Sequence, residues 1–141
     1  MILKSFEIKK INQTINNLIL FYGKNEGLKN EALNTLVEEG DNISNYEEKE
    51  ILDNENNFIE NILSKSLFES QKFIVIKRTT DKILKIIETL QQKKLEDVTI
   101  ILNSDNLEKR SKLRSLFEKD KKLVCVPFYP DNDQTLSKLA Y

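Results

Sequence analysis

The sequence predicts an α/β fold in which a parallel sheet of about five strands carries helices on both faces, making three layers. Short apolar runs rich in β-branched and aromatic residues recur along the chain, and segments with helical spacing lie between them. Continuous apolar runs suit parallel strands that are covered on both faces, because alternation appears where one face meets water. The regular alternation of strand and helix requires right-handed crossovers between parallel strands. The 141 residues fit a single domain of this type.

The strands are predicted from these apolar runs. Four strong candidates and a weaker fifth one are, in chain order, Leu18 to Tyr22, Asn42 to Tyr46 (the weaker one), Phe73 to Ile76, Val98 to Leu102 and Leu123 to Phe128. Apart from the weak candidate, the polar segment 38–57 is expected to form a loop or a poorly formed strand, because it is rich in Asn and Glu.

The helices are predicted from apolar stripes with a period near 3.6 residues. The stripes consist of Leu28, Ala32, Leu36 and Val37; of Phe58, Ile59, Ile62 and Leu63; of Ile83, Leu84, Ile87 and Leu90; and of Leu107, Leu113, Leu116 and Phe117. The last helix is expected to begin near Ser104 and Asp105. Glu108 stands three residues after Asp105, as in a capping box.

Composition excludes several classes of function. The chain has no histidine, which removes Ser-His-Asp and Cys-His catalysis and leaves one thiol with only carboxylates as possible metal ligands. Its one thiol, Cys125, lies in an apolar run and is expected to be a buried structural residue. The net charge is -1, from 22 basic and 23 acidic side chains, so no global field draws the chain to nucleic acid. No secretory signal and no apolar run near the roughly 18 residues of a membrane span are present, which favours a cytoplasmic protein.

The turn after the first strand stands where a phosphate-binding loop would lie, but it departs from the working pattern. That pattern, G-x-x-x-x-G-K-[ST], needs its second glycine for close backbone approach, its lysine for phosphate and its hydroxyl for Mg²⁺. Gly23 and Lys29 match it. Leu28 replaces the second glycine and Asn30 replaces the hydroxyl residue. The residues alone equally allow an ordinary turn between a strand and a helix.

The acidic half of such a nucleotide site is missing as well. A buried strand would normally end in carboxylates that hold Mg²⁺, whereas the third strand is followed by Lys77 and Arg78. Two cations there would repel the metal, so ATP hydrolysis is not expected. A phosphoacceptor domain would need an Asp at a strand end, and Tyr22, Lys77 and Asn103 occupy those positions instead.

The order of these features resembles the delta subunit of the bacterial DNA polymerase III clamp loader. The matching blocks are LILFYGKNEGLKNEAL, SKSLFESQKFIVIKR and VTIILNSDNLEKRSKLRSLFEK followed by LVCVPF, which together cover nearly the whole chain. The most specific element is the tripeptide Ser66, Leu67 and Phe68 shortly before a buried strand. The family carries a similar tripeptide there, and its Leu and Phe enter a hydrophobic pocket on the sliding clamp.

The resemblance implies an AAA+-like domain over residues 1–130, with 131–141 as the start of a linker or of a lid domain. A helical collar domain would follow and join the other loader subunits, delta prime and gamma or tau. Such delta subunits bind and open the clamp ring, the beta subunit, without hydrolysing ATP, and they meet primer-template DNA only indirectly. No cofactor, metal or membrane is implied. Asn103 falls where active relatives sense the γ phosphate, and here a capping or loop role is expected.

Three alternatives stay open on the residues alone. Leu67 and Phe68 could fold back into a satellite core instead of standing exposed on the flank of a helix at 100° per residue. The chain could be a nucleotide-binding enzyme of the phosphate-loop type. It could also be a nucleic-acid-binding module, whose basic residues would be Lys109, Arg110, Lys112, Arg114, Lys119, Lys121 and Lys122, although Glu108, Glu118 and Asp120 dilute them.

Overall fold

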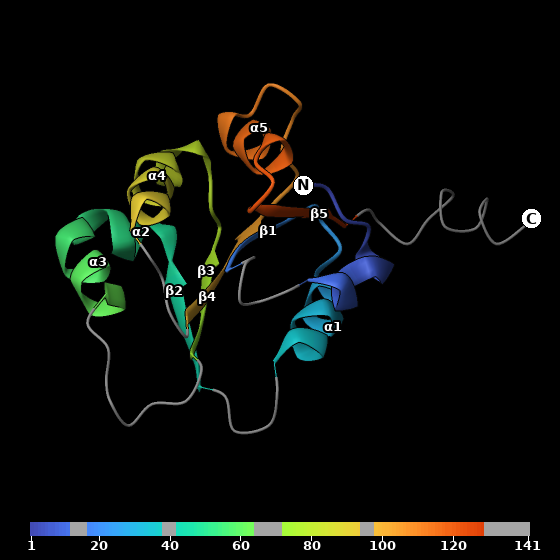
Figure 1. Cartoon of the computed structure of the whole chain (residues 1–141), viewed down its shortest axis with the longest axis horizontal. Helices are drawn as coiled ribbons and strands as arrows, with labels where there is room; N and C mark the ends of the chain where they lie inside the picture. The colour runs from blue at the N-terminus through green and yellow to red at the C-terminus, as the bar shows by residue number, and fades with distance from the viewer. Residues whose placement is uncertain (12–16, 38–41, 64–71, 94–97, 129–141) are drawn as a thin grey trace, which may run out of the picture.

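The structure is a computed structural model that describes residues 1–11, 17–37, 42–63, 72–93 and 98–128. Its centre is a sheet of five strands in the order β2-β3-β4-β1-β5, and all neighbouring strands are parallel (Figure 1). The strands are β1 (Leu18–Tyr22), β2 (Asn42–Glu47), β3 (Lys72–Lys77), β4 (Val98–Ser104) and β5 (Val124–Pro127). The parallel α/β sheet expected from the sequence is therefore confirmed, and the weak candidate at 42–46 is a strand.

Helices cover both faces of this sheet (Figure 1). One face carries the 3-10 helix η1 (Ser5–Lys10) and α1 (Glu26–Leu36). The other face carries α2 (Glu48–Asp53), α3 (Glu55–Leu63), the short 3-10 helix η2 (Asp81–Ile83), α4 (Leu84–Gln92) and α5 (Lys112–Lys119). Among these described helices, none combines the length and the apolar character that crossing a bilayer would require.

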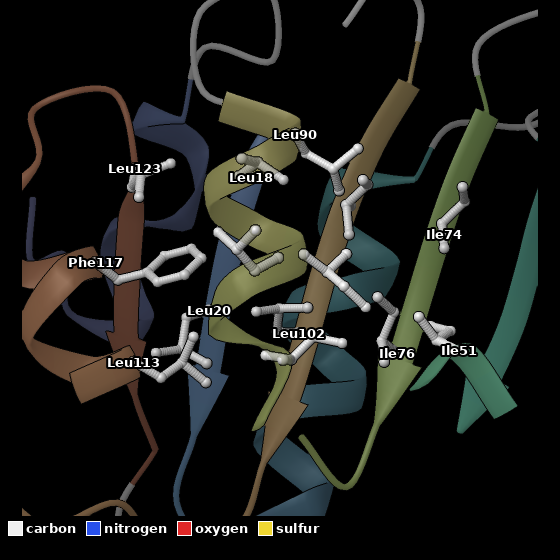
Figure 2. Close-up of a cluster of buried hydrophobic side chains, with 14 of the residues drawn as sticks. Leu18, Leu20, Ile51, Ile74, Ile76, Leu90, Leu102, Leu113, Phe117 and Leu123 are labelled. Atoms are coloured by element: carbon white, nitrogen blue, oxygen red, sulfur yellow. The ribbon is translucent and has the colours of Figure 1, made fainter. Parts of the chain in front are cut away.

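The apolar strands divide their side chains between two cores. Leu18 and Leu20 of β1 belong to the larger cluster under α2 to α5, whereas Ile19 and Phe21 belong to the cluster under η1 and α1. Every residue of β1 is buried. Figure 2 shows the larger cluster, in which Leu113 and Phe117 of α5 lie close to Leu20. Because both faces are covered, β1, β3, β4 and β5 show continuous apolar runs instead of an apolar–polar alternation, whereas the edge strand β2 is mostly polar.

The start of the last helix differs from the sequence-based expectation. The capping box at Asp105 and Glu108 does not form, because β4 extends to Ser104 and α5 begins only at Lys112. Ser111 is the N-cap of α5, and its hydroxyl accepts a hydrogen bond from the backbone N–H of Arg114 at 3.2 Å. The carboxylate of Asp81, from η2, supplies further acceptors to this helix start.

The segment expected to be largely a loop contains a helix. Helix α2 directly follows β2. Its first residue, Glu48, is buried, and its carboxylate accepts hydrogen bonds from the backbone N–H of Thr80 at 2.6 Å and from the hydroxyl of Thr80 at 2.8 Å. Ile51 is buried in the larger core cluster. These partners lie elsewhere in the chain, which is why the local composition did not predict the helix.

Candidate functional site at the carboxyl ends of the strands

The candidate site lies where β1, β3 and β4 end. In open α/β sheets, ligands bind in the crevice outside the carboxyl ends of the strands, where the strand order changes direction. A hollow of about 840 Å³ is found here. It is lined by Lys24, Glu26, Asn30, Lys77, Arg78, Thr79, Thr80, Asn103 and Asp105. Four of the residues that the sequence assigned to a degenerate nucleotide site, namely Asn30, Lys77, Arg78 and Asn103, are thus brought together.

Gly23 has a backbone role in the turn after β1. Its φ is +120°, and a Cβ atom there would lie 1.9 Å from the carbonyl oxygen of Phe128. The neighbouring carbonyl of Tyr22 accepts the N–H of Phe128 at 2.7 Å. The glycine therefore allows the turn to pack directly against the end of β5, which accounts for it without any phosphate.

The start of α1 is occupied by the protein's own side chains. Asn25 is the N-cap, and its Oδ1 accepts the N–H of Leu28 at 3.1 Å. The Leu28 side chain packs against the core cluster beneath η1 and α1. Asn30 is exposed. A glycine at position 28 would leave room for phosphate oxygens, whereas the leucine here contributes to the packing of the helix instead.

Lys29, the lysine that matches the phosphate-loop pattern, is buried and fully hydrogen-bonded. Its side chain is 1% exposed. Its Nζ donates to Asn103 Oδ1 at 2.9 Å, to the carbonyl oxygen of Ser104 at 2.7 Å and to Glu26 Oε1 at 3.2 Å. An ammonium group has three N–H donors. All three therefore have acceptors within the chain, of which the Glu26 carboxylate belongs to an exposed side chain.

A buried polar cluster surrounds this lysine at the end of β4. The N–H of Thr79 donates to the carbonyl oxygen of Asn103 at 3.2 Å, and the hydroxyls of Thr79 and Ser104 share a hydrogen bond. Thr79 and Ser104 are both buried. Asn103 thus helps to hold Lys29, a role that differs from the capping or loop role expected for it. Glu26 and Thr79 were not singled out from the sequence, and Ser104 was considered only as a helix start, because no local pattern links these residues to Lys29.

Lys77 and Arg78 lie at the rim of the hollow, at the end of β3. Both side chains are exposed. Arg78 has a φ of +57°, which is uncommon for a residue other than glycine, and its Nη1 lies 3.2 Å from Glu47 Oε1. The Arg78 side chain is 85% exposed, so this ion pair contributes little to stability, about 0 to 1 kcal/mol. Two cations stand where a Mg²⁺ site would need carboxylates.

The remaining candidates give no catalytic group. Cys125 is buried on β5, and burial raises the pKa of its thiol to about 12, so it is not a nucleophile near neutral pH. In the described ranges no cluster of three or more metal-ligating side chains occurs. Two arginines of the basic cluster are paired with acids, Arg110 with Glu108 at 2.6 Å and Arg114 with Glu118 at 3.0 Å.

The tripeptide Ser66, Leu67 and Phe68 falls outside the described residues, between Leu63 at the end of α3 and Lys72 at the start of β3. Upstream of it, Phe58 and Ile62 of α3 are buried in the larger core cluster, as the apolar stripe predicted. The assignment of a clamp-binding role to the tripeptide therefore stays a prediction.

Comparisons with known proteins identify the fold. No model of a protein family matches the sequence, and no curated protein matches it. Among solved structures, the chain is similar to the DNA clamp loader delta protein of Bacillus subtilis, with a TM-score of 0.67 and 16% sequence identity. The match covers 95% of this chain and 44% of that one. The chain thus shares the fold of that protein and spans less than half of its length.

Proposed function

We propose that this chain is the clamp-contacting, AAA+-like domain of a clamp loader delta subunit, and that it takes part in loading sliding clamps during DNA replication. The observation that carries the proposal is the fold shared with the clamp loader delta protein over 95% of this chain. The tripeptide and the altered phosphate loop were found in the sequence without that comparison. The partners would be a sliding clamp and the other loader subunits.

In this proposal the chain hydrolyses no ATP. Lys29 supports this, because an ammonium group that already donates to Asn103, Ser104 and Glu26 has no donor left for a phosphate. Binding ATP through Lys29 would require the fold to give up at least one of these hydrogen bonds, of which the one to the Ser104 carbonyl oxygen is buried. Lys77 and Arg78 at the rim would in addition oppose Mg²⁺. Both features favour a subunit that binds a partner over a nucleotide-dependent enzyme.

The clamp contact would be made by Leu67 and Phe68. Phe58 and Ile62 show which side of α3 faces the core. If the helix period continues, Phe68 stands roughly opposite that side and Leu67 on the flank. Two large apolar side chains outside the core are suitable anchors, since burying each is worth about 1.5 to 3 kcal/mol. Ring opening has an additional requirement, which is that the loader bind the open clamp more tightly than the closed one.

The test compares two double variants, one at Leu67 and Phe68 and one at Phe58 and Ile62. Leu67→Ala with Phe68→Ala should weaken binding to the cognate clamp by about thirtyfold or more, because truncating a hot spot costs roughly 2 kcal/mol. The free energy of unfolding should change by less than about 0.5 kcal/mol, as for other surface substitutions. Binding is measured by surface plasmon resonance and stability by urea unfolding.

The matched control is Phe58→Ala with Ile62→Ala in α3. Truncating these buried side chains should lower the free energy of unfolding by about 2 to 5 kcal/mol for each residue. If the Leu67 and Phe68 variant instead loses stability to a similar degree, while its folded fraction binds the clamp normally, the two residues belong to the core and the proposal fails.

A further inference from the structure

The amino group of Met1 is held by three backbone carbonyl groups. Its ammonium form donates hydrogen bonds to the carbonyl oxygen of Phe117 at 2.7 Å, of Asp120 at 2.8 Å and of Leu123 at 2.8 Å. An ammonium group has three N–H donors. All three of them are therefore used by carbonyl groups that lie 116 to 122 residues later in the sequence.

Two of these carbonyl groups belong to the carboxyl end of α5. Phe117 lies in the last turn of this helix, and Asp120 is its C-cap. The last four carbonyl groups of a helix have no partner within the helix, and the helix dipole places partial negative charge there. A cation at this position is stabilised by the hydrogen bonds and by the dipole. The Met1 ammonium therefore caps α5 from outside the helix.

The residues after Met1 continue along the outer edge of β5. Ile2 pairs in parallel with Cys125. The N–H of Leu3 donates to the carbonyl oxygen of Cys125 at 2.9 Å, and the N–H of Cys125 donates to the carbonyl oxygen of Met1 at 2.8 Å. On its other side Cys125 pairs with Leu20 of β1. In Figure 1 the N-terminus lies beside α5 and β5. The segment thus covers a sheet edge that would otherwise be open to pairing with another chain.

These contacts suit only an unmodified amino group. Partial burial lowers the pKa of the Met1 amino group, whereas the nearby carboxylates of Asp120 and Glu118 raise it. The three hydrogen bonds also favour the charged form, because the neutral amine has only two N–H donors. An acyl group on the nitrogen would leave a single N–H donor, remove the charge and place a further carbonyl oxygen beside the three acceptors.

We propose that the fold requires a free amino group on Met1, and that acylation of this nitrogen releases residues 1–3 from the edge of β5. The formyl group with which bacterial translation begins therefore has to be removed before the N-terminal segment can pack. This requirement follows from the contacts of residues 1–3 with α5 and β5, and it does not depend on the proposed clamp contact.

Two preparations of the chain that differ by one formyl group test this requirement. Translation in a reconstituted bacterial system without deformylase leaves the formyl group on Met1, adding the deformylase removes it, and intact mass identifies each product. The formylated chain should have a Tm lower by at least about 4 °C, because hydrogen bonds to a charged group are lost. Equal Tm values of the two preparations would overturn the proposal.

Lys121→Gln in the deformylated chain is the control for the loss of a positive charge. It removes one charge from an exposed side chain in the loop between α5 and β5. Its Tm should change by less than about 2 °C, as for other surface substitutions. A decrease as large as that of the formylated chain would assign the effect to net charge and so contradict the role of the three hydrogen bonds.

Hydrogen exchange locates the effect within the fold. The amides of Leu3 and Cys125 should exchange at least about tenfold faster in the formylated chain, since their hydrogen bonds join the N-terminal segment to β5. The Ile100 amide, which donates to the carbonyl oxygen of Asn17 at 2.8 Å, is the internal reference and should be accelerated much less. Equal acceleration of all three amides would mean that the whole domain is weakened, and the local release of residues 1–3 would be wrong.

Discussion

At the scale of the residue, Lys29 combines the position of a phosphate-loop lysine with a buried, hydrogen-bonded side chain. Its position after the first strand matches the lysine of a phosphate loop. In the structure the Lys29 ammonium donates a hydrogen bond to Asn103, which lies 74 residues later in the sequence. Its hydrogen bonds therefore link α1 to the end of β4. A lysine buried in this way is tolerated because each N–H has an acceptor.

Replacing Lys29 with methionine therefore tests a structural role. Lys29→Met keeps most of the side chain's length but removes the hydrogen bonds to the half-buried Asn103 Oδ1 and to the buried carbonyl oxygen of Ser104, so the free energy of unfolding should fall by about 1 to 3 kcal/mol. Urea unfolding measures the change. Lys24→Met, which alters an exposed lysine in the same turn, should change it by less than about 0.5 kcal/mol. Equal stability of both variants would show that the Lys29 hydrogen bonds do not support the fold.

At the scale of the element, the two glycines around the start of α1 have opposite roles. Gly23 ends β1 with a positive φ and touches the backbone at Phe128, whereas Gly27 lies in the first turn of α1. A Cβ at Gly27 would come no closer than 3.6 Å to Asn25 Oδ1, an ordinary contact. The same substitution should thus have opposite effects at positions only four residues apart.

Gly23→Ala should lower the free energy of unfolding by more than about 2 kcal/mol, because the added Cβ collides with the Phe128 carbonyl and the φ of +120° disfavours an L-residue. Gly27→Ala should raise it by about 0.4 to 1 kcal/mol, because alanine reduces the entropy of the unfolded chain and favours the helix. Thermal and urea unfolding of the two variants measure both effects. A shift of the same sign in both would contradict this account of the turn.

The start of α5 depends on a carboxylate from another element. Asp81 accepts hydrogen bonds from the Ser111 hydroxyl at 2.6 Å and from the N–H groups of Lys112 and Leu113, both at 3.2 Å. These bonds, the Ser111 hydroxyl foremost, hold the pKa of Asp81 below its ordinary value. Because the folded-state pKa is lowered, the stabilisation is complete above about pH 4 and is lost as the pH falls through the folded-state pKa.

Asp81→Asn should accordingly cost stability at pH 7 and cost less at about pH 3, which lies below the ordinary pKa of an aspartate carboxyl. The loss at pH 7 should be about 1 kcal/mol, as for other helix-start acceptors. Urea unfolding at both pH values provides the comparison, with Asp53→Asn in α2 as an exposed control. If Asp81→Asn lowers the free energy of unfolding by the same amount at both pH values, the effect comes from packing and not from the carboxylate charge.

At the scale of the whole molecule, the strand order and the three layers are compatible with nucleotide hydrolysis as well as with partner binding. We base the distinction on the carboxyl edge of the sheet, where Lys29 is buried and Lys77 and Arg78 are exposed. The function therefore depends on a few side chains placed on a widely used architecture.

A thermal unfolding experiment with Mg-ATP addresses the whole domain. A ligand present at a hundred times its Kd stabilises the folded state by about 2.7 kcal/mol, which would raise Tm by several degrees. We expect a change of less than about 1 °C up to millimolar Mg-ATP, because Lys29 has no free donor. A phosphate-loop ATPase in the same buffer serves as the positive control. A saturable increase in Tm would refute the proposed absence of nucleotide binding.

The sequence by itself determined the α/β class, the strand positions and most helical stripes. The spacing of apolar residues within a segment indicates which of its side chains are buried in the folded protein. It also identified Leu28 and Asn30 as departures from a phosphate loop. It did not predict α2 or the start of α5, since Glu48 and Ser111 depend on Thr80 and Asp81, which lie about 30 residues away.

Only the tertiary structure decided how the residues at the carboxyl edge are used. Lys29 and Asn103 were read separately in the sequence, one as a remnant of a phosphate loop and the other as a loop residue. The parallel pairing of β1 with β4 brings their segments together and gives the lysine acceptors that no local pattern specifies. Periodicity encodes burial within a segment, whereas a hydrogen bond between distant segments depends on strand order and register, which only the folded chain fixes.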